Sequence, residues 1–100
     1  MKILFHSLLL ILFCFSLSAD KGEVVYEKND YYIVDIGYSY TLIEWYGGCL
    51  PSEGDILVGN LKSYGFKDIY NVSKEREMRA YIEDYLLSKE DAIEMIYECN

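Results

Sequence analysis

Histidine is nearly absent from this chain, and its scarcity excludes several kinds of enzyme. The single histidine, His6, lies in an N-terminal segment that we expect to be removed. The remaining chain therefore cannot build a Ser-His or Cys-His nucleophile pair or a histidine-containing zinc site. The glycine stretches "YGGC" and "YGF" match neither the P-loop nor the dinucleotide-binding pattern. We therefore expect a protein that is not an enzyme and that needs no cofactor and no metal.

Paired carboxylates are the catalytic groups that remain. The neighbouring acids Glu83 and Asp84, Glu90 and Asp91, and Glu53 and Asp55 are the candidates for glycosidase-like acid–base catalysis. Such neighbours arise by chance in a chain with 17 acidic residues. A small domain also has little room for a substrate cleft, so we favour a non-catalytic function.

Basic residues are few as well. The chain has 9 Lys and Arg against 17 Asp and Glu. Removal of residues 1–19, which hold Lys2 and no acid before Asp20, leaves 8 basic and 17 acidic residues, a formal charge of −9. Phosphate backbones and anionic lipid surfaces repel such a chain. We expect no nucleic acid partner and, after removal of the leader, no membrane partner; a basic protein is the partner that this charge favours.

The only long apolar run lies at the N-terminus. Lys2 precedes an apolar segment at residues 3–17, and small residues follow it. This layout is typical of a secretory signal peptide, and the run of about 15 residues is short of the roughly 20 that a membrane span needs. We predict a signal peptide at residues 1–19 and a secreted or periplasmic protein. The sequence leaves open cleavage after Ser18 or after Ala19, with an uncleaved anchor as the alternative.

Cysteine is scarce, and its placement predicts a disulfide. Cys14 leaves with the signal peptide, so Cys49 and Cys99 are the cysteines of the mature chain, residues 20–100. An export context oxidises thiols, and two cysteines allow one connectivity. The predicted Cys49–Cys99 bond closes a loop of about 50 residues and would stabilise a small domain by up to about 4 kcal/mol. It would fasten the turn-like segment "EWYGGCLPSEGD" to the C-terminus.

Runs of β-branched and aromatic residues, separated by turn residues, dominate the mature chain and indicate antiparallel strands. We predict strands at residues 23–27, 31–36, 40–46, 55–61 and 67–72. In the third run, alternation places Ile43 and Trp45 toward the core and Glu44 on the wetter face. The polar segment 73–78 is expected to be a loop or a single helical turn.

The C-terminal part combines an ambiguous segment with a helix. Residues 79–87 fit a strand or a helix, and we favour a strand because "SKED" at Ser88 resembles the start of a new helix. That helix, residues 89–98, carries Ala92, Met95, Ile96 and Cys99 on one face. We therefore predict one domain at residues 20–100 with a mainly β (α+β) fold. It is a small bent antiparallel sheet or an SH3-like or OB-like barrel of five to six strands, with one C-terminal helix and one disulfide.

Tyrosine is abundant, with eleven residues, all of them after residue 19. Tyrosine forms strands well and packs its ring at half-buried positions, which accounts for much of this content. Tyr and Trp are also enriched where proteins bind each other. The speculative binding residues cluster around the second and third predicted strands: Tyr31, Tyr32, Tyr38, Tyr40, Glu44, Trp45 and Tyr46.

Three functions fit these observations. The first is a non-catalytic protein-binding module, of the inhibitor or immunity kind, that presents an acidic, tyrosine-rich surface to a basic partner and acts as a monomer. The second is a carbohydrate-binding or small-ligand-binding domain that uses the same aromatic rings for stacking. The third is a structural protein of the envelope or the extracellular space.

Overall fold

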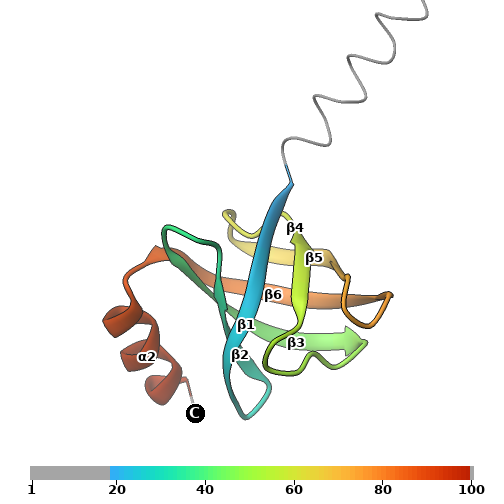
Figure 1. Ribbon diagram of the computed structural model, residues 1–100. Helices are drawn as coiled ribbons and strands as arrows, with labels where there is room; N and C mark the ends of the chain where they lie inside the picture. The colour runs from blue at the N-terminus through green and yellow to red at the C-terminus, as the bar shows by residue number, and fades with distance from the viewer. Residues whose placement is uncertain (1–18, 100) are drawn as a thin grey trace, which may run out of the picture.

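The computed structural model describes residues 19–99, which form six strands and one helix (Figure 1). The elements are β1 (Asp20–Lys28), β2 (Tyr31–Asp35), β3 (Tyr40–Gly48), β4 (Ile56–Gly59), β5 (Gly65–Asn71), β6 (Arg76–Leu87) and α2 (Lys89–Glu98). Except for Ala19, the predicted signal peptide at residues 1–19 lies outside the described residues. Within residues 19–99, no helix has the length and hydropathy to cross a membrane.

The six strands form a closed antiparallel barrel in the order β1-β2-β3-β6-β5-β4. Two meanders, β1-β2-β3 and β4-β5-β6, join through the pairs β3–β6 and β1–β4. The helix α2 follows β6 and lies outside the barrel, beside β2 (Figure 1). A mainly β domain with a small barrel and a C-terminal helix is thereby confirmed.

Several element boundaries differ from the prediction. The strand β1 begins at Asp20 rather than at residue 23, and β4 covers only Ile56–Gly59 of the predicted 55–61. The strand β6 begins at Arg76, inside the segment predicted as a loop or turn. Pairing with β5 extends this polar stretch into the sheet, because Met78 lies opposite the buried Ile69.

The first hairpin shows how local sequence shapes the barrel. Asn29 and Asp30 connect β1 to β2 with φ angles of 50° and 67°. A two-residue type I′ turn needs positive φ at both central residues, and Asn and Asp adopt this conformation more readily than other non-glycine residues. The turn sets the register in which Lys28 faces Tyr31.

The barrel interior is the main core. Inward-facing side chains alternate along the strands, as in Val24, Val34, Ile43 and Ile82, all of which are fully buried. Trp45 packs against the same cluster, which confirms the prediction that Ile43 and Trp45 face inward.

A second apolar cluster lies on the outer surface of β2 and β3, under α2. Ala92 and Ile96 of the helix pack on Ile33 and Leu42. The helix begins as predicted, because the Ser88 hydroxyl accepts a hydrogen bond from the backbone N–H three residues later. The strand at residues 79–87 that precedes it is confirmed as well.

The predicted disulfide is wrong: Cys49 and Cys99 are both free. Cys49 is buried in the barrel interior, whereas Cys99 packs with the cluster outside the barrel, under α2. The two thiols belong to separate clusters, one inside the barrel and one outside it, so they do not meet. The fold therefore keeps Cys49 and Cys99 apart, although they are the only two cysteines that could pair in the mature chain.

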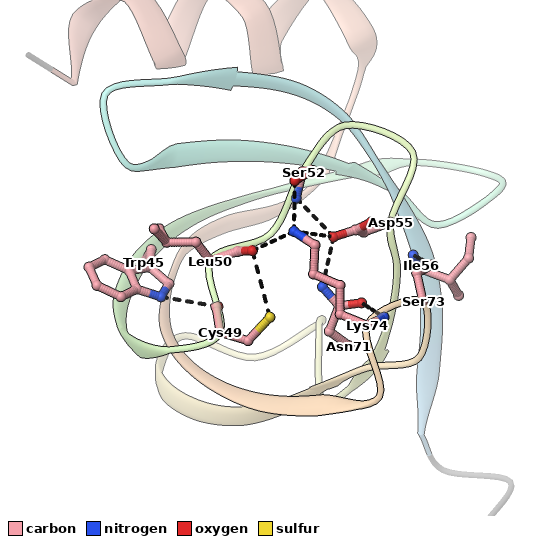
Figure 2. A network of polar contacts seen from close by, with 9 residues as sticks. All are labelled: Trp45, Cys49, Leu50, Ser52, Asp55, Ile56, Asn71, Ser73 and Lys74. Atoms are coloured by element: carbon pink, nitrogen blue, oxygen red, sulfur yellow. Dashed lines mark hydrogen bonds and ion pairs between the residues drawn. The ribbon is translucent and has the colours of Figure 1, made fainter.

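A polar network holds the Cys49 loop instead (Figure 2). The Asp55 carboxylate accepts hydrogen bonds from the Ser52 N–H and the Asn71 side-chain amide, both at 2.9 Å, and pairs with Lys74 at 3.1 Å. The Lys74 ammonium also donates to the Leu50 carbonyl at 2.7 Å. These contacts join the β3–β4 loop to the β5–β6 turn.

The environment of Asp55 keeps it charged. Burial alone would raise the pKa of its carboxyl, but hydrogen bonds from Asn71 and Ser52, together with Lys74, outweigh burial and lower the pKa below its ordinary value of 3.8. Asn71, fully buried, is thus matched by a charged acceptor. The network satisfies buried polar groups that would otherwise destabilise the fold.

Candidate functional site

The structure gathers only some of the predicted binding residues on one surface. Tyr32 is 2% exposed and Trp45 packs in the barrel core, so both face inward. Tyr31 and Tyr40 pack against the outer cluster under α2. All four help to pack the domain, and Tyr31 also lies opposite Glu44 of β3.

The other three predicted residues lie farther out, with Tyr38 apart from Glu44 and Tyr46. Tyr38 is 68% exposed in the β2–β3 turn, where its hydroxyl accepts a hydrogen bond from the Lys62 ammonium at 2.6 Å. Glu44 and Tyr46 lie on the outer face of β3, two residues apart. The outer face of β3 continues across β6 and β5, where the sequence predicted no binding residue, although Glu83 of β6 was among the candidate catalytic acids.

Three aromatic side chains form a cluster on this continuous face, one each from β3, β5 and β6. The ring centroids of Tyr46 and Phe66 are 4.9 Å apart, and those of Phe66 and Tyr81 are 5.0 Å apart, both edge to face. Tyr46 is 53% and Phe66 48% exposed. We call Tyr46, Phe66 and Tyr81 the aromatic cluster. The rings pack edge to face, although Tyr46 and Phe66 each remain about half exposed to solvent.

A cation of the chain itself sits on the aromatic cluster. The guanidinium of Arg79 lies 5.2 Å from the Phe66 ring centroid and 2.9 Å from the Asp68 carboxylate. This ion pair is exposed, so it contributes little to stability. It shows that the face accommodates a guanidinium between a ring and a carboxylate.

Two carboxyl groups, Glu44 and Glu83, lie next to the aromatic cluster. Glu44 pairs with Tyr81 across β3 and β6, which places Glu83, two residues farther along β6, on the same face. Burial raises the pKa of Glu83, and a hydrogen bond and the charge of Glu44 raise it further. We call Glu44 and Glu83 the carboxyl pair. The charge of Glu44 makes ionisation of Glu83 less favourable.

Three further polar groups surround the carboxyl pair. Burial, followed by the charge of Glu44, raises the pKa of Tyr31 to about 12. The charge of Glu44 raises the pKa of Tyr46, and burial followed by the charges of both glutamates raises that of Cys99. The hydroxyls and the thiol therefore stay protonated at neutral pH. Beside the two glutamates, the charge of Lys28 on β1 also acts on Cys99.

The spacing of the residues contains a signal for this site. Glu44 and Tyr46 stand two residues apart in "EWY", and Tyr81 and Glu83 stand two apart in "YIE". Period-two spacing predicts that each Tyr and Glu share a strand face. The pairing of the two strands, 35 or more residues apart, was the information missing from the sequence pattern.

A pocket lies between α2 and the first two strands. It encloses about 330 Å³ and is lined by Val25, Tyr26, Ile33, Asp35, Tyr40, Lys89 and Ile93. Apolar side chains form most of this lining, with one carboxylate and one ammonium group. Its volume is at the lower end of the range of small-molecule sites.

The site offers hydrogen-bond acceptors and aromatic surface rather than metal ligands. No group of three His, Cys, Asp or Glu side chains within residues 19–99 is arranged to hold a metal ion. The aromatic cluster and the carboxyl pair together suit contact with a positively charged surface. In comparisons with known proteins, the chain matches no family model, no curated protein and no solved structure.

Proposed function

We propose that this is a secreted or periplasmic, non-catalytic binding module, of the inhibitor or immunity kind, that captures a basic protein on the outer face of β3, β6 and β5. The observation that carries the proposal is the half-exposed aromatic cluster beside the carboxyl pair. Aromatic rings supply large contact areas and dominate binding energy at many protein interfaces.

Charge supports the same partner. The mature chain has a formal charge of −9, from 8 basic and 17 acidic residues. A charge of this size speeds the encounter with a basic protein and selects against acidic ones. Export rests on the predicted signal peptide. The finer comparison of the barrel with SH3-like or OB-like folds stays a prediction, as do a monomeric state and the exclusion of nucleic acid and cofactors.

A pull-down tests the proposal. The mature protein is immobilised and exposed to extracellular or periplasmic extract at low and high salt, and retained proteins are identified by mass spectrometry. A basic protein should be retained at low salt and lost at high salt, because salt screens the attraction. A double variant, Tyr46→Ser with Phe66→Ser, should not retain it.

The matched control is Tyr38→Ser, which removes a tyrosine that is exposed elsewhere on the barrel. This variant should bind the partner as the wild type does. Melting curves verify that all variants are folded. Equal retention by the double variant and the wild type would contradict the proposed binding face.

The pocket under α2 favours a second candidate, a carbohydrate-binding or small-ligand-binding domain. Its roughly 330 Å³ and its mixed lining suit a small amphiphilic molecule. Binding of a neutral ligand there should hardly change with salt. A glycan array and a ligand-observed NMR screen of the mature protein separate this candidate from the first.

A further inference from the structure

We propose that the carboxyl pair, Glu44 and Glu83, is the binding site for a single arginine side chain of the partner protein. The inference rests on the proposed function and names the chemical group that the outer face recognises. Aromatic rings lie beside carboxyl groups at two places on this face. At the first place a guanidinium of the chain itself contacts both, and at the second place the carboxyl groups form no ion pair.

The first arrangement contains a guanidinium. Arg79 lies over the Phe66 ring at 5.2 Å and against the Asp68 carboxylate at 2.9 Å. An aromatic ring and a carboxylate thus both contact one planar cation. Guanidinium groups favour this combination because they stack on rings and donate hydrogen bonds in their plane.

The second arrangement has two carboxyl groups, and none of the ion pairs of the described residues includes them. Glu44 and Glu83 lie beside the Tyr31 and Tyr46 rings, and both glutamates act on these hydroxyls. The ion pairs within residues 19–99 join Lys62 to Asp20, Lys74 to Asp55 and Arg79 to Asp68. None of these basic side chains pairs with Glu44 or Glu83.

Glu83 of β6 faces Glu44 of β3, and Tyr31 of β2 and Cys99 after α2 lie against both. One basic side chain of another element acts nearby: Lys28 of β1 acts on Cys99, and its ammonium lies over the Tyr97 ring at 5.2 Å. The carboxyl pair itself forms no ion pair with Lys62, Lys74 or Arg79. Two half-buried carboxyl groups repel each other when both are ionised, and a cation placed between them reduces this repulsion. The gain appears only when the partner binds.

Arginine fits this site better than lysine. A guanidinium presents five donors in a plane and bridges two carboxylates while its face rests on a tyrosine ring. Lysine offers a compact, strongly hydrated charge that cannot do both. The neighbouring aromatic cluster then contacts the apolar surface around the arginine on the partner.

The test is an NMR titration of the isotope-labelled mature protein with capped hexa-arginine, hexa-lysine and hexa-citrulline peptides. Hexa-arginine should shift the amide signals of Glu44, Tyr46, Tyr81 and Glu83 and bind several-fold tighter than hexa-lysine. The uncharged hexa-citrulline should cause no shift. The carboxyl ¹³C signal of Glu83 should titrate at lower pH when hexa-arginine is bound, because the cation favours the ionised form.

Two variants with the same change of charge provide the control. Glu83→Gln should weaken hexa-arginine binding at least about tenfold. Glu94→Gln, at an exposed position on α2, should leave it nearly unchanged. Equal effects of the two variants would show attraction by overall charge and overturn the inference.

The inference and the proposed function fail in different ways. If Glu83→Gln has no effect while the aromatic-cluster variant still loses the natural partner in the pull-down, the arginine site is overturned and the binding face stands. If the partner is retained without the aromatic cluster, the proposed function itself fails.

Discussion

At the scale of single residues, the Asp55 carboxylate organises the loop that a disulfide was expected to hold. It connects Ser52, Asn71 and Lys74 (Figure 2). One ionised group with several donors achieves this because charge-assisted hydrogen bonds are stronger than neutral ones.

Replacement of Asp55 by Asn should lower the free energy of unfolding by about 2–4 kcal/mol, because buried donors lose a charged acceptor and Lys74 loses its partner. Urea denaturation measures the change. The control is Asp68→Asn, which breaks an exposed ion pair and should lower this free energy by less than about 1 kcal/mol. Similar losses in both variants would contradict the role of the network.

The two cysteines provide a second prediction. Since both thiols are free, a reducing agent should leave the melting temperature of the mature protein unchanged. Cys99 should react slowly with a thiol reagent, because burial raises the pKa of its thiol. A thiol count on the denatured mature protein should find both. A fall in melting temperature on reduction would contradict the free state of the cysteines.

At the scale of elements, the end of β3 depends on a glycine. Gly48 has a φ of 75°, and a Cβ atom there would lie 2.7 Å from the Glu77 carbonyl oxygen on β6. The backbone of β6 cannot move away easily, since β6 is paired on both sides. The neighbouring Gly47 has no atom within 4 Å of such a Cβ.

Gly48→Ala should therefore reduce the free energy of unfolding by about 1–3 kcal/mol. Gly47→Ala, one residue away, should change it by no more than about 0.5 kcal/mol. Thermal and urea denaturation of both variants measure the difference. Equal stabilities would show that the strand end adapts to a side chain.

The elements themselves were largely predictable from the sequence, because local patterns determine them. Aromatic and β-branched runs marked the strands, and Ser88 marked the start of α2. The start of β6 was not predictable, because Arg76 joins the sheet only through its pairing with Asn71. This pair closes a short hairpin, and its polar residues lack the apolar alternation that marks a strand in a sequence.

At the scale of the whole molecule, the candidate site depends on contacts between distant segments. The carboxyl pair forms because β3 and β6 meet in one particular register with several irregularities. The spacing within each strand was visible in the sequence, but that register was not. The disulfide prediction failed for the same reason, since counting cysteines carries no information about distance.

The combined contribution of Glu83 and Asp55 to stability should be greatest between pH 3.8 and 4.5. The pKa of Glu83 in the folded protein is above its ordinary value of 4.5. The free energy of unfolding therefore rises as the pH falls through the folded pKa of Glu83, and this stabilisation is complete below pH 4.5. The pKa of Asp55 is below 3.8, so its contribution, complete above 3.8, is lost as the pH falls through its folded pKa.

Urea denaturation across this pH range measures the profile. Glu83→Gln should flatten the part above pH 4.5, whereas Glu94→Gln should keep it, because both variants share the background change in net charge. A profile that is identical in the two variants would contradict the coupling of Glu83 to Glu44.

The strand pairs of the barrel differ in the number of paired residues, so some parts of the barrel should open more easily than others. The strands β4 and β5 are joined only at Leu57–Asn71 and Val58–Tyr70, while β5 and β6 pair from Gly65–Ile82 to Asn71–Arg76. Local opening should therefore begin at β4, where backbone amides should exchange their hydrogens fastest. The aromatic cluster lies on the three strands with the long ladders. Its surface is preorganised, so association need not order the backbone beneath it.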